Sequence, residues 1–157
     1  MARLTKYKTK LTDDRKVVLE KEVSMNYPDV KRIVRSPDDA ANVARNVLNI
    51  QDESEEYLYM FCLNTKNHIT SIFELSHGNV RSSIFSVREM FQKALLANAV
   101  SVILVHNHPS GDPTPSREDI QVTKRAIDAG DILGVQVLDH LIIGDIIYVS
   151  LKEKGHI

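Results

Sequence analysis

Two histidines and an aspartate in one short stretch of the chain have the residue types and spacing of a metal site. His106 and His108 sit two residues apart at the end of an apolar run, and Asp119 follows eleven residues after His108. A catalytic zinc ion needs three protein ligands and one open position. Because an open zinc site makes a nucleophile from water at neutral pH, this stretch predicts hydrolytic chemistry.

The elements around these residues are those that would bring them together. Residues i and i+2 of a strand point to the same side, so His106 and His108 are expected to project together where an apolar strand over residues 100–105 ends. Pro109 ends the ladder of that strand, since it has no N–H to donate. A loop rich in glycine and proline then returns the chain, and Asp119 follows in the first turn of a helix.

The third ligand has alternatives. Asp119 lies three residues after Ser116, which is the spacing of a capping box, so its carboxylate could serve the helix start instead of a metal. His140 and Asp139, on the strand expected after the helix, offer a competing third ligand. The spacing from the two histidines favours Asp119, and the alternatives stay open at this point.

The remaining pattern predicts an α/β fold. Helices are expected to start at Ser36, Ser86 and Ser116, each a residue that caps helices, and the last to end near Gly130. Strands are expected over residues 17–19, 56–63, 69–75, 80–85, 100–105, 135–143 and 146–151, the last two joined by a tight turn at residues 144–145. Alternating helices and strands predict three layers, with a mixed β-sheet flanked by helices.

Composition limits the class of protein. A chain of 157 residues predicts one domain. It contains no apolar run long enough to cross a membrane, and its start lacks the apolar core of a signal peptide. The single cysteine, Cys62, is expected in the core and fits a reducing compartment. A cytoplasmic location is therefore expected.

Charge divides the chain unevenly. Residues 1–35 hold ten Lys/Arg and five Asp/Glu, whereas residues 36–157 hold ten and sixteen. We therefore expect a basic N-terminal arm over residues 1–35, loosely ordered in its first 15 residues, ahead of a domain over residues 36–157. Such an arm could contact the phosphates of a nucleic acid.

The residues quoted so far resemble a known motif. His-x-His followed after ten residues by Asp, with Ser three before the Asp, resembles the JAMM motif of the JAB/MPN metalloprotease superfamily. The longer string His106-Asn-His-Pro-Ser-Gly with Pro115-Ser-x-x-Asp119 resembles the RadC branch. Further matching pieces are Glu56 with Leu63-Asn64-Thr-Lys-Asn67, Val87-Arg88-Glu89 with Ala94, Leu138-Asp-His-Leu-Ile-Ile-Gly144 and Ser150-Leu-Lys-Glu-Lys-Gly155.

The resemblance implies a role for each matched position. It implies a JAB/MPN-like fold with the layered architecture of cytidine deaminases, and zinc held by His106, His108 and Asp119. Glu56 matches the family glutamate that takes a proton from the zinc-bound water, and Ser116 matches the serine that helps to stabilise the oxyanion. Glu56 itself lies in a run of acidic residues, which without the resemblance is typical of a solvated loop.

The leading functional hypothesis is a zinc-dependent hydrolase of peptide or isopeptide bonds, acting on a peptide or protein substrate. The alternative is a DNA-repair-associated factor that binds nucleic acid through the basic arm, although the helix-hairpin-helix region of long RadC proteins is not recognised here. A metal-binding module without catalysis is a further alternative. A zinc deaminase is disfavoured, since it needs a Cys-x-x-Cys pair and the chain has one cysteine. The oligomeric state is left open.

Overall fold

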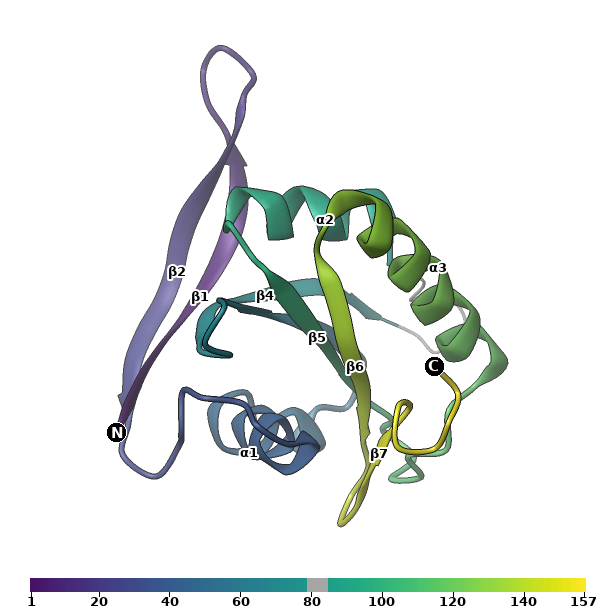
Figure 1. The fold of residues 1–157 in the computed structure, drawn as a ribbon. Coiled ribbons are helices and arrows are strands. Elements are labelled where there is room, and N and C mark those ends of the chain that lie inside the picture. The colour runs from purple at the N-terminus through teal and green to yellow at the C-terminus, as the bar shows by residue number, and fades with distance from the viewer. Residues whose placement is uncertain (79–84) are drawn as a thin grey trace.

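A single mixed β-sheet lies between helices in the computed structural model, which describes residues 1–78 and 85–157 (Figure 1). The strands are β1 (Ala2–Leu11), β2 (Val17–Tyr27), β3 (Glu56–Leu63), β4 (Ile69–Gly78), β5 (Ser101–Asn107), β6 (Gln136–Ile143) and β7 (Tyr148–Ser150). The helices are α1 (Pro37–Val47), the short 3-10 turn η1 (Ile50–Asp52), α2 (Val87–Leu96) and α3 (Arg117–Leu133). The expected three-layer α/β fold is confirmed.

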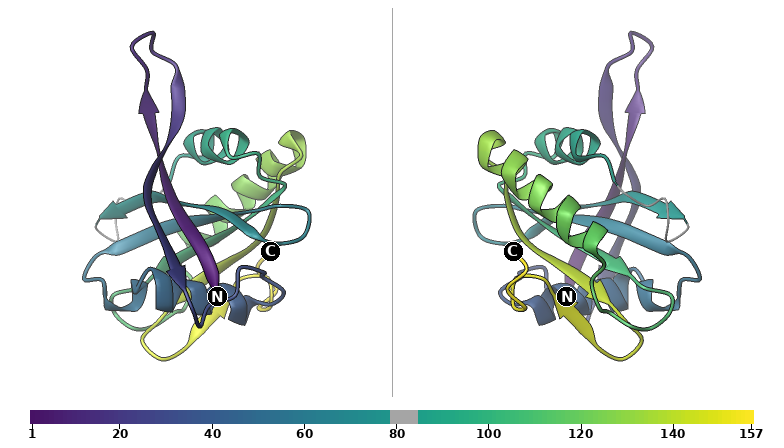
Figure 2. Two further views of the ribbon diagram at one scale, coloured as in Figure 1. Left: turned by 90° about the vertical axis from the view of Figure 1, so that its left-hand side faces the viewer. Right: turned by 90° about the vertical axis from the view of Figure 1, so that its right-hand side faces the viewer.

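The seven strands lie in the order β2-β1-β4-β3-β5-β6-β7. Strand β5 pairs antiparallel with β3 and parallel with β6, and every one of its residues is buried. Helix α1 covers one face of the sheet, and α2 and α3 cover the other (Figures 1 and 2). A strand that is covered on both faces needs apolar residues throughout, which explains the unbroken apolar run before His106.

Two apolar cores lie on the two faces of the sheet, and β3 contributes to both. Tyr59 and Phe61 pack in the core under α1, whereas Met60 and Cys62 pack in the core under α2 and α3. This alternation is the normal geometry of a strand. Cys62 is fully buried, as expected.

The N-terminal residues form a hairpin, which corrects the expectation of a loosely ordered arm. Strands β1 and β2 pair antiparallel over their whole lengths, and β1 joins the sheet beside β4. Ion pairs link Lys6 to Glu22, and Lys8 and Lys10 to Glu20, across the two strands. The pattern was missed because both strands are largely polar, so their stability depends on cross-strand pairs. The expected domain boundary at residue 35 stays a prediction.

Two expected boundaries were wrong. Helix α3 does not end at Gly130 but continues to Leu133, with Gly134 as its cap at φ 73°. Gly130 instead allows a close approach, since an added Cβ would lie 2.3 Å from the carbonyl oxygen of Val135. The final turn is longer than two residues, because the Gly144 N–H bonds to the Ile147 carbonyl and β7 begins only at Tyr148.

The strand expected over residues 80–85 falls almost wholly outside the described residues; Phe85 is described and buried. Within residues 1–78 and 85–157, no helix has the length and apolar character needed to cross a membrane.

Candidate metal centre

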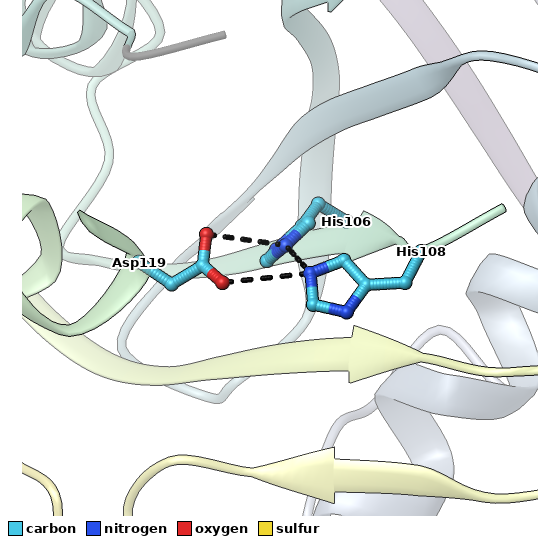
Figure 3. A group of neighbouring side chains, drawn as sticks. All are labelled: His106, His108 and Asp119. Atoms are coloured by element: carbon cyan, nitrogen blue, oxygen red, sulfur yellow. Dashed lines mark hydrogen bonds and ion pairs between the residues drawn. The ribbon is translucent and has the colours of Figure 1, made fainter. Parts of the chain in front are cut away.

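The end of β5 presents two imidazoles to the first turn of α3. His106 is the penultimate residue of β5, and His108 follows just beyond the strand, where its N–H still bonds to the Ile143 carbonyl of β6. This extended backbone sends both side chains to the same side, as the i, i+2 spacing predicted. Asp119, at the start of α3, faces both rings across the intervening loop (Figure 3).

The three side chains converge on one point. The Nε2 atoms of His106 and His108 lie 3.0 Å apart, and each lies 3.4 Å from a carboxylate oxygen of Asp119. Ligands 2.0–2.1 Å from a tetrahedral zinc ion are separated by about 3.3–3.4 Å. The three residues could therefore hold a metal ion through two nitrogens and one oxygen.

Asp119 serves the helix start and faces the histidines at the same time. Its Oδ2 accepts the Ser116 N–H at 2.7 Å, and the Ser116 hydroxyl accepts the Asp119 N–H at 3.0 Å, which completes a capping box. The two interpretations of Asp119 thus do not exclude each other. Ser116 lies at the helix cap beside the cluster, with its hydroxyl on the Asp119 N–H.

The two competing ligands lie elsewhere. His140 sits behind His106, with its Nε2 2.7 Å from His106 Nδ1 and its Nδ1 2.6 Å from the Thr123 hydroxyl. Its Nε2 therefore faces the back of His106 and its Nδ1 faces Thr123, so neither ring nitrogen points to the place where the three candidate ligand atoms converge. Asp139 accepts hydrogen bonds from the Ser150 hydroxyl and from the backbone N–H groups of its neighbours His140 and Lys152. Asp119 is the carboxylate that the structure brings to the two histidines.

Glu56 begins β3, the strand paired antiparallel with β5. Its Oε1 lies 4.0 Å from His108 Nε2, and the residue is 8% exposed. Glu55, its neighbour in the acidic run, is exposed. The structure thus brings Glu56, rather than Glu55, to the edge of the cluster.

Asn107, between the two histidines, is a site residue that the sequence reasoning missed. Its side-chain oxygen accepts the Tyr57 N–H at 2.7 Å, and its amide nitrogen donates to the Glu55 carbonyl at 2.9 Å. These two bonds enclose Glu56 and hold the backbone on both sides of it. The signal available in the sequence was an amide between the two histidines at the end of an apolar run, and the structure buries this amide.

Burial and close contacts shift the pKa values of all three residues of the cluster. Burial, together with His140, holds the pKa of His106 well below its usual value. Burial also disfavours the charged form of His108, but contacts with Asp119 and the Asp112 carbonyl outweigh it and raise the pKa. Against its own burial, Asp119 has a lowered pKa because of His108, His106 and Ser116. The carboxylate is therefore ionised and able to neutralise a cation.

A small cavity opens beside these groups. Polar side chains and apolar side chains share its wall, and the lining residues are Glu56, Tyr57, Leu58, Phe85, His106, Asp119, Val122 and His140. Apolar walls limit the water around the reacting groups, which strengthens electrostatic interactions there.

The chain is similar in sequence to a known protein family. The family model described as the RadC-like JAB domain matches residues 34–156. A UPF0758 protein of Desulfitobacterium hafniense is 48% identical over 128 residues, which cover 82% of this chain and 56% of that protein. A UPF0758 protein of Caldanaerobacter subterraneus is 51% identical over 123 residues, which cover 78% of this chain and 52% of that protein.

The UPF0758 protein YsxA of Bacillus subtilis is 46% identical over 125 residues, which cover 80% of this chain and 53% of that protein. The chain thus spans about half the length of the relatives it matches. The match of the family model includes the cluster and Glu56. This chain belongs to the RadC-like JAB domain family.

Proposed function

We propose that the protein is a zinc-dependent hydrolase of peptide or isopeptide bonds. The observation that carries the proposal is the position of Glu56, whose Oε1 lies 4.0 Å from His108 Nε2 at the edge of a group that could hold a metal. A carboxylate at a three-ligand site is the arrangement needed for metal-assisted hydrolysis.

Three residues would hold the ion. His106 and His108 would bind it through Nε2, and Asp119 through a carboxylate oxygen, because these are the atoms that converge. A zinc ion held there supplies an acidified water and a Lewis acid for a carbonyl oxygen.

Glu56 would move the proton. Its Oε1 would accept a proton from the attacking water and later deliver it to the leaving amine. A positioned carboxylate of this kind contributes about 10²–10⁴-fold to a rate. Ser116 would assist at the substrate oxygen, because its hydroxyl accepts the Asp119 N–H and keeps its own hydrogen to donate.

The test separates metal binding from chemistry. Purified wild type, Glu56→Gln and Glu55→Gln, each loaded with zinc, are incubated with a peptide library, and new amino groups are counted. We expect Glu56→Gln to keep its zinc and to lose at least about a hundredfold of the rate, whereas Glu55→Gln behaves as wild type. Full hydrolysis by Glu56→Gln would refute the role of Glu56.

Binding of nucleic acid stays a prediction. The lysines of β1 that would meet phosphates already pair with Glu20 and Glu22, which reduces the positive charge that the hairpin presents. A phosphate-binding hairpin would show binding to DNA that weakens steeply with salt and is lost when Lys8 and Lys10 are replaced by Gln. Salt-independent binding, or none, would remove this candidate.

A further inference from the structure

A line of hydrogen bonds runs from the back of His106 into α3. His106 Nδ1 lies 2.7 Å from His140 Nε2, and His140 Nδ1 lies 2.6 Å from the Thr123 hydroxyl oxygen. The Thr123 hydroxyl in turn donates to the Asp119 carbonyl at 2.6 Å. His140 and Thr123 are 1% and 0% exposed, so both side chains are buried.

The position of each proton follows from the last acceptor. A carbonyl oxygen can only accept, so the single hydroxyl hydrogen of Thr123 is committed to Asp119. The Thr123 oxygen must then accept from His140, which places a hydrogen on His140 Nδ1. In the neutral ring of His140, Nε2 is left as an acceptor.

The same logic reaches the metal site. Because His140 Nε2 accepts, the hydrogen between the two rings belongs to His106 Nδ1. His106 then presents the lone pair of Nε2 to the group formed with His108 and Asp119. Burial disfavours the charged form of His140, and the partners at its two ring nitrogens are those that a neutral ring can satisfy.

The other histidine reaches the same state by a simpler route. His108 Nδ1 lies 2.8 Å from the Asp112 carbonyl, which can only accept, so in the neutral ring Nδ1 carries the hydrogen and Nε2 the lone pair. His106 has a second imidazole where His108 has a carbonyl. An imidazole nitrogen can donate or accept, so His140 alone does not fix the tautomer of His106. The Thr123 hydroxyl fixes the tautomer of His140, which then fixes that of His106.

We propose that Thr123 and His140 are positioning residues of the metal centre, which fix the tautomer and orientation of His106. The line of hydrogen bonds also connects His106, on β5, to the turn of α3 that carries Asp119. Partners behind a metal-binding histidine commonly change metal affinity by about 10- to 100-fold. The inference rests on the metal site of the proposed function, but it does not depend on hydrolysis.

The decisive substitution removes one hydroxyl and keeps the shape. In Thr123→Val, His140 loses the acceptor at Nδ1 and can place its hydrogen on Nε2, which turns the hydrogen of His106 toward the ligands. We expect zinc affinity, measured by competition with a chelator, to fall about 10- to 100-fold in Thr123→Val. Thr123→Ser should restore the wild-type value.

A control variant separates the line of hydrogen bonds from the general loss of a threonine hydroxyl that donates to a backbone carbonyl; the control residue, Thr70, is half-buried. Thr70 on β4 donates its hydroxyl to the Cys62 carbonyl at 3.2 Å, within the same sheet, and its hydrogen bond involves none of the metal residues. Thr70→Val should keep the wild-type zinc affinity. Equal losses in Thr70→Val and Thr123→Val, or zinc affinity in Thr123→Val within twofold of wild type, would overturn the proposal.

The tautomers can also be read directly. In ¹⁵N NMR spectra of the zinc-free wild-type chain at neutral pH, we expect His106 and His140 to carry hydrogen on Nδ1. Hydrogen on Nε2 of His106 would overturn the proposal, whether or not Thr123→Val folds. A wild type that binds zinc, shows these tautomers and hydrolyses nothing would refute the proposed function and leave this inference standing.

Discussion

The Nε2 atoms of His106 and His108 face each other across 3.0 Å, separated in the chain only by Asn107. Each ring uses its Nδ1 for a hydrogen bond on the far side. Two nitrogen lone pairs at this distance repel unless a positive charge lies between them. Binding of a cation by both rings would remove this repulsion, so zinc should stabilise the folded chain.

Zinc should raise the free energy of unfolding. A ligand that binds only the folded chain adds about 2.7 kcal/mol at a concentration of 100 times its Kd. Urea denaturation with and without zinc measures this gain. The free energy of unfolding of Asp119→Ala should rise far less with zinc. Equal rises in the two proteins would contradict a zinc site to which Asp119 contributes.

Asp119 caps α3 and is a candidate metal ligand, and these two roles can be separated by comparison with Asp39, which has only a capping role. Ser36 and Asp39 form the same capping box at α1 that Ser116 and Asp119 form at α3, and Asp39 lies outside the candidate metal group. In chelator, Asp39→Ala and Asp119→Ala should each lose about 1 kcal/mol of stability. Only Asp119→Ala should lose zinc affinity. A similar loss of zinc affinity in Asp39→Ala would show that capping alone explains the effect.

Gly144 should be needed to keep the loop that follows His108 in place. An added Cβ there would lie 2.5 Å from the Gly111 carbonyl oxygen and 2.9 Å from Pro113. Gly144→Ala must push this loop away, and with it the Asp112 carbonyl that orients His108. We expect a loss of about 1–3 kcal/mol in stability together with weaker zinc binding.

The control for this substitution is Gly155→Ala. Among the described residues other than its chain neighbours, none has an atom within 4 Å of a Cβ added at Gly155, although its φ of 73° makes alanine unfavourable. Gly155→Ala should therefore lose stability without losing zinc affinity. Unchanged zinc binding in Gly144→Ala would argue against the coupling between this turn and the metal centre.

The zinc-free chain should become less stable as the pH falls from 7 to 5. Burial lowers the pKa of His140 to about 4, whereas the unfolded chain has the ordinary histidine value of about 6.5. Between these values the unfolded chain binds a proton that the folded chain does not, so acid favours unfolding. This single group contributes about 2 kcal/mol between pH 7 and 5.

Urea denaturation in chelator at both pH values measures this dependence, with His140→Gln as the comparison. The raised pKa of His108 acts in the opposite sense and the lowered pKa of His106 in the same sense, so the difference between the two proteins reports the removal of His140 together with its effect on His106. The stability of His140→Gln should depend less on pH. Identical slopes in the two proteins would show that His140 titrates normally.

Cys62 should resist thiol reagents in the folded chain. Burial raises the pKa of its thiol to about 12, so almost no reactive thiolate forms at pH 8. We expect the reaction with a colorimetric disulfide reagent to be at least about a thousandfold slower than in urea. Equally fast reaction in both conditions would contradict the burial of Cys62.

The sequence predicted the core of the fold because there the pattern and the environment agree. The apolar run before His106 is typical of a strand covered on both faces, and the start of α3 was marked by its cap, Ser116. The β1–β2 hairpin was missed because its stability depends on pairs such as Lys8 with Glu20, which no single segment reveals. The end of α3 was misplaced because Gly130 serves packing rather than termination.

At the candidate site, too, local sequence patterns predicted some residues and missed those whose roles depend on contacts between elements. Spacing was enough to bring His106, His108 and Asp119 together as candidates, since two lie on one strand end and the third opens the next helix. The roles of Asn107, which holds the backbone around Glu56, and of Thr123, which bonds to His140, come from contacts between elements. Such contacts depend on the register of β3 against β5 and of α3 over β6, which local patterns do not contain.

The central claim is that His106, His108 and Asp119 jointly hold one divalent ion. The most direct test is metal analysis of the purified chain, wild type beside Asp119→Ala, after both have been exposed to zinc and dialysed. The account predicts about one zinc per chain in the wild type and almost none in the variant. A wild type without bound metal, or a variant that retains as much as the wild type, would contradict it.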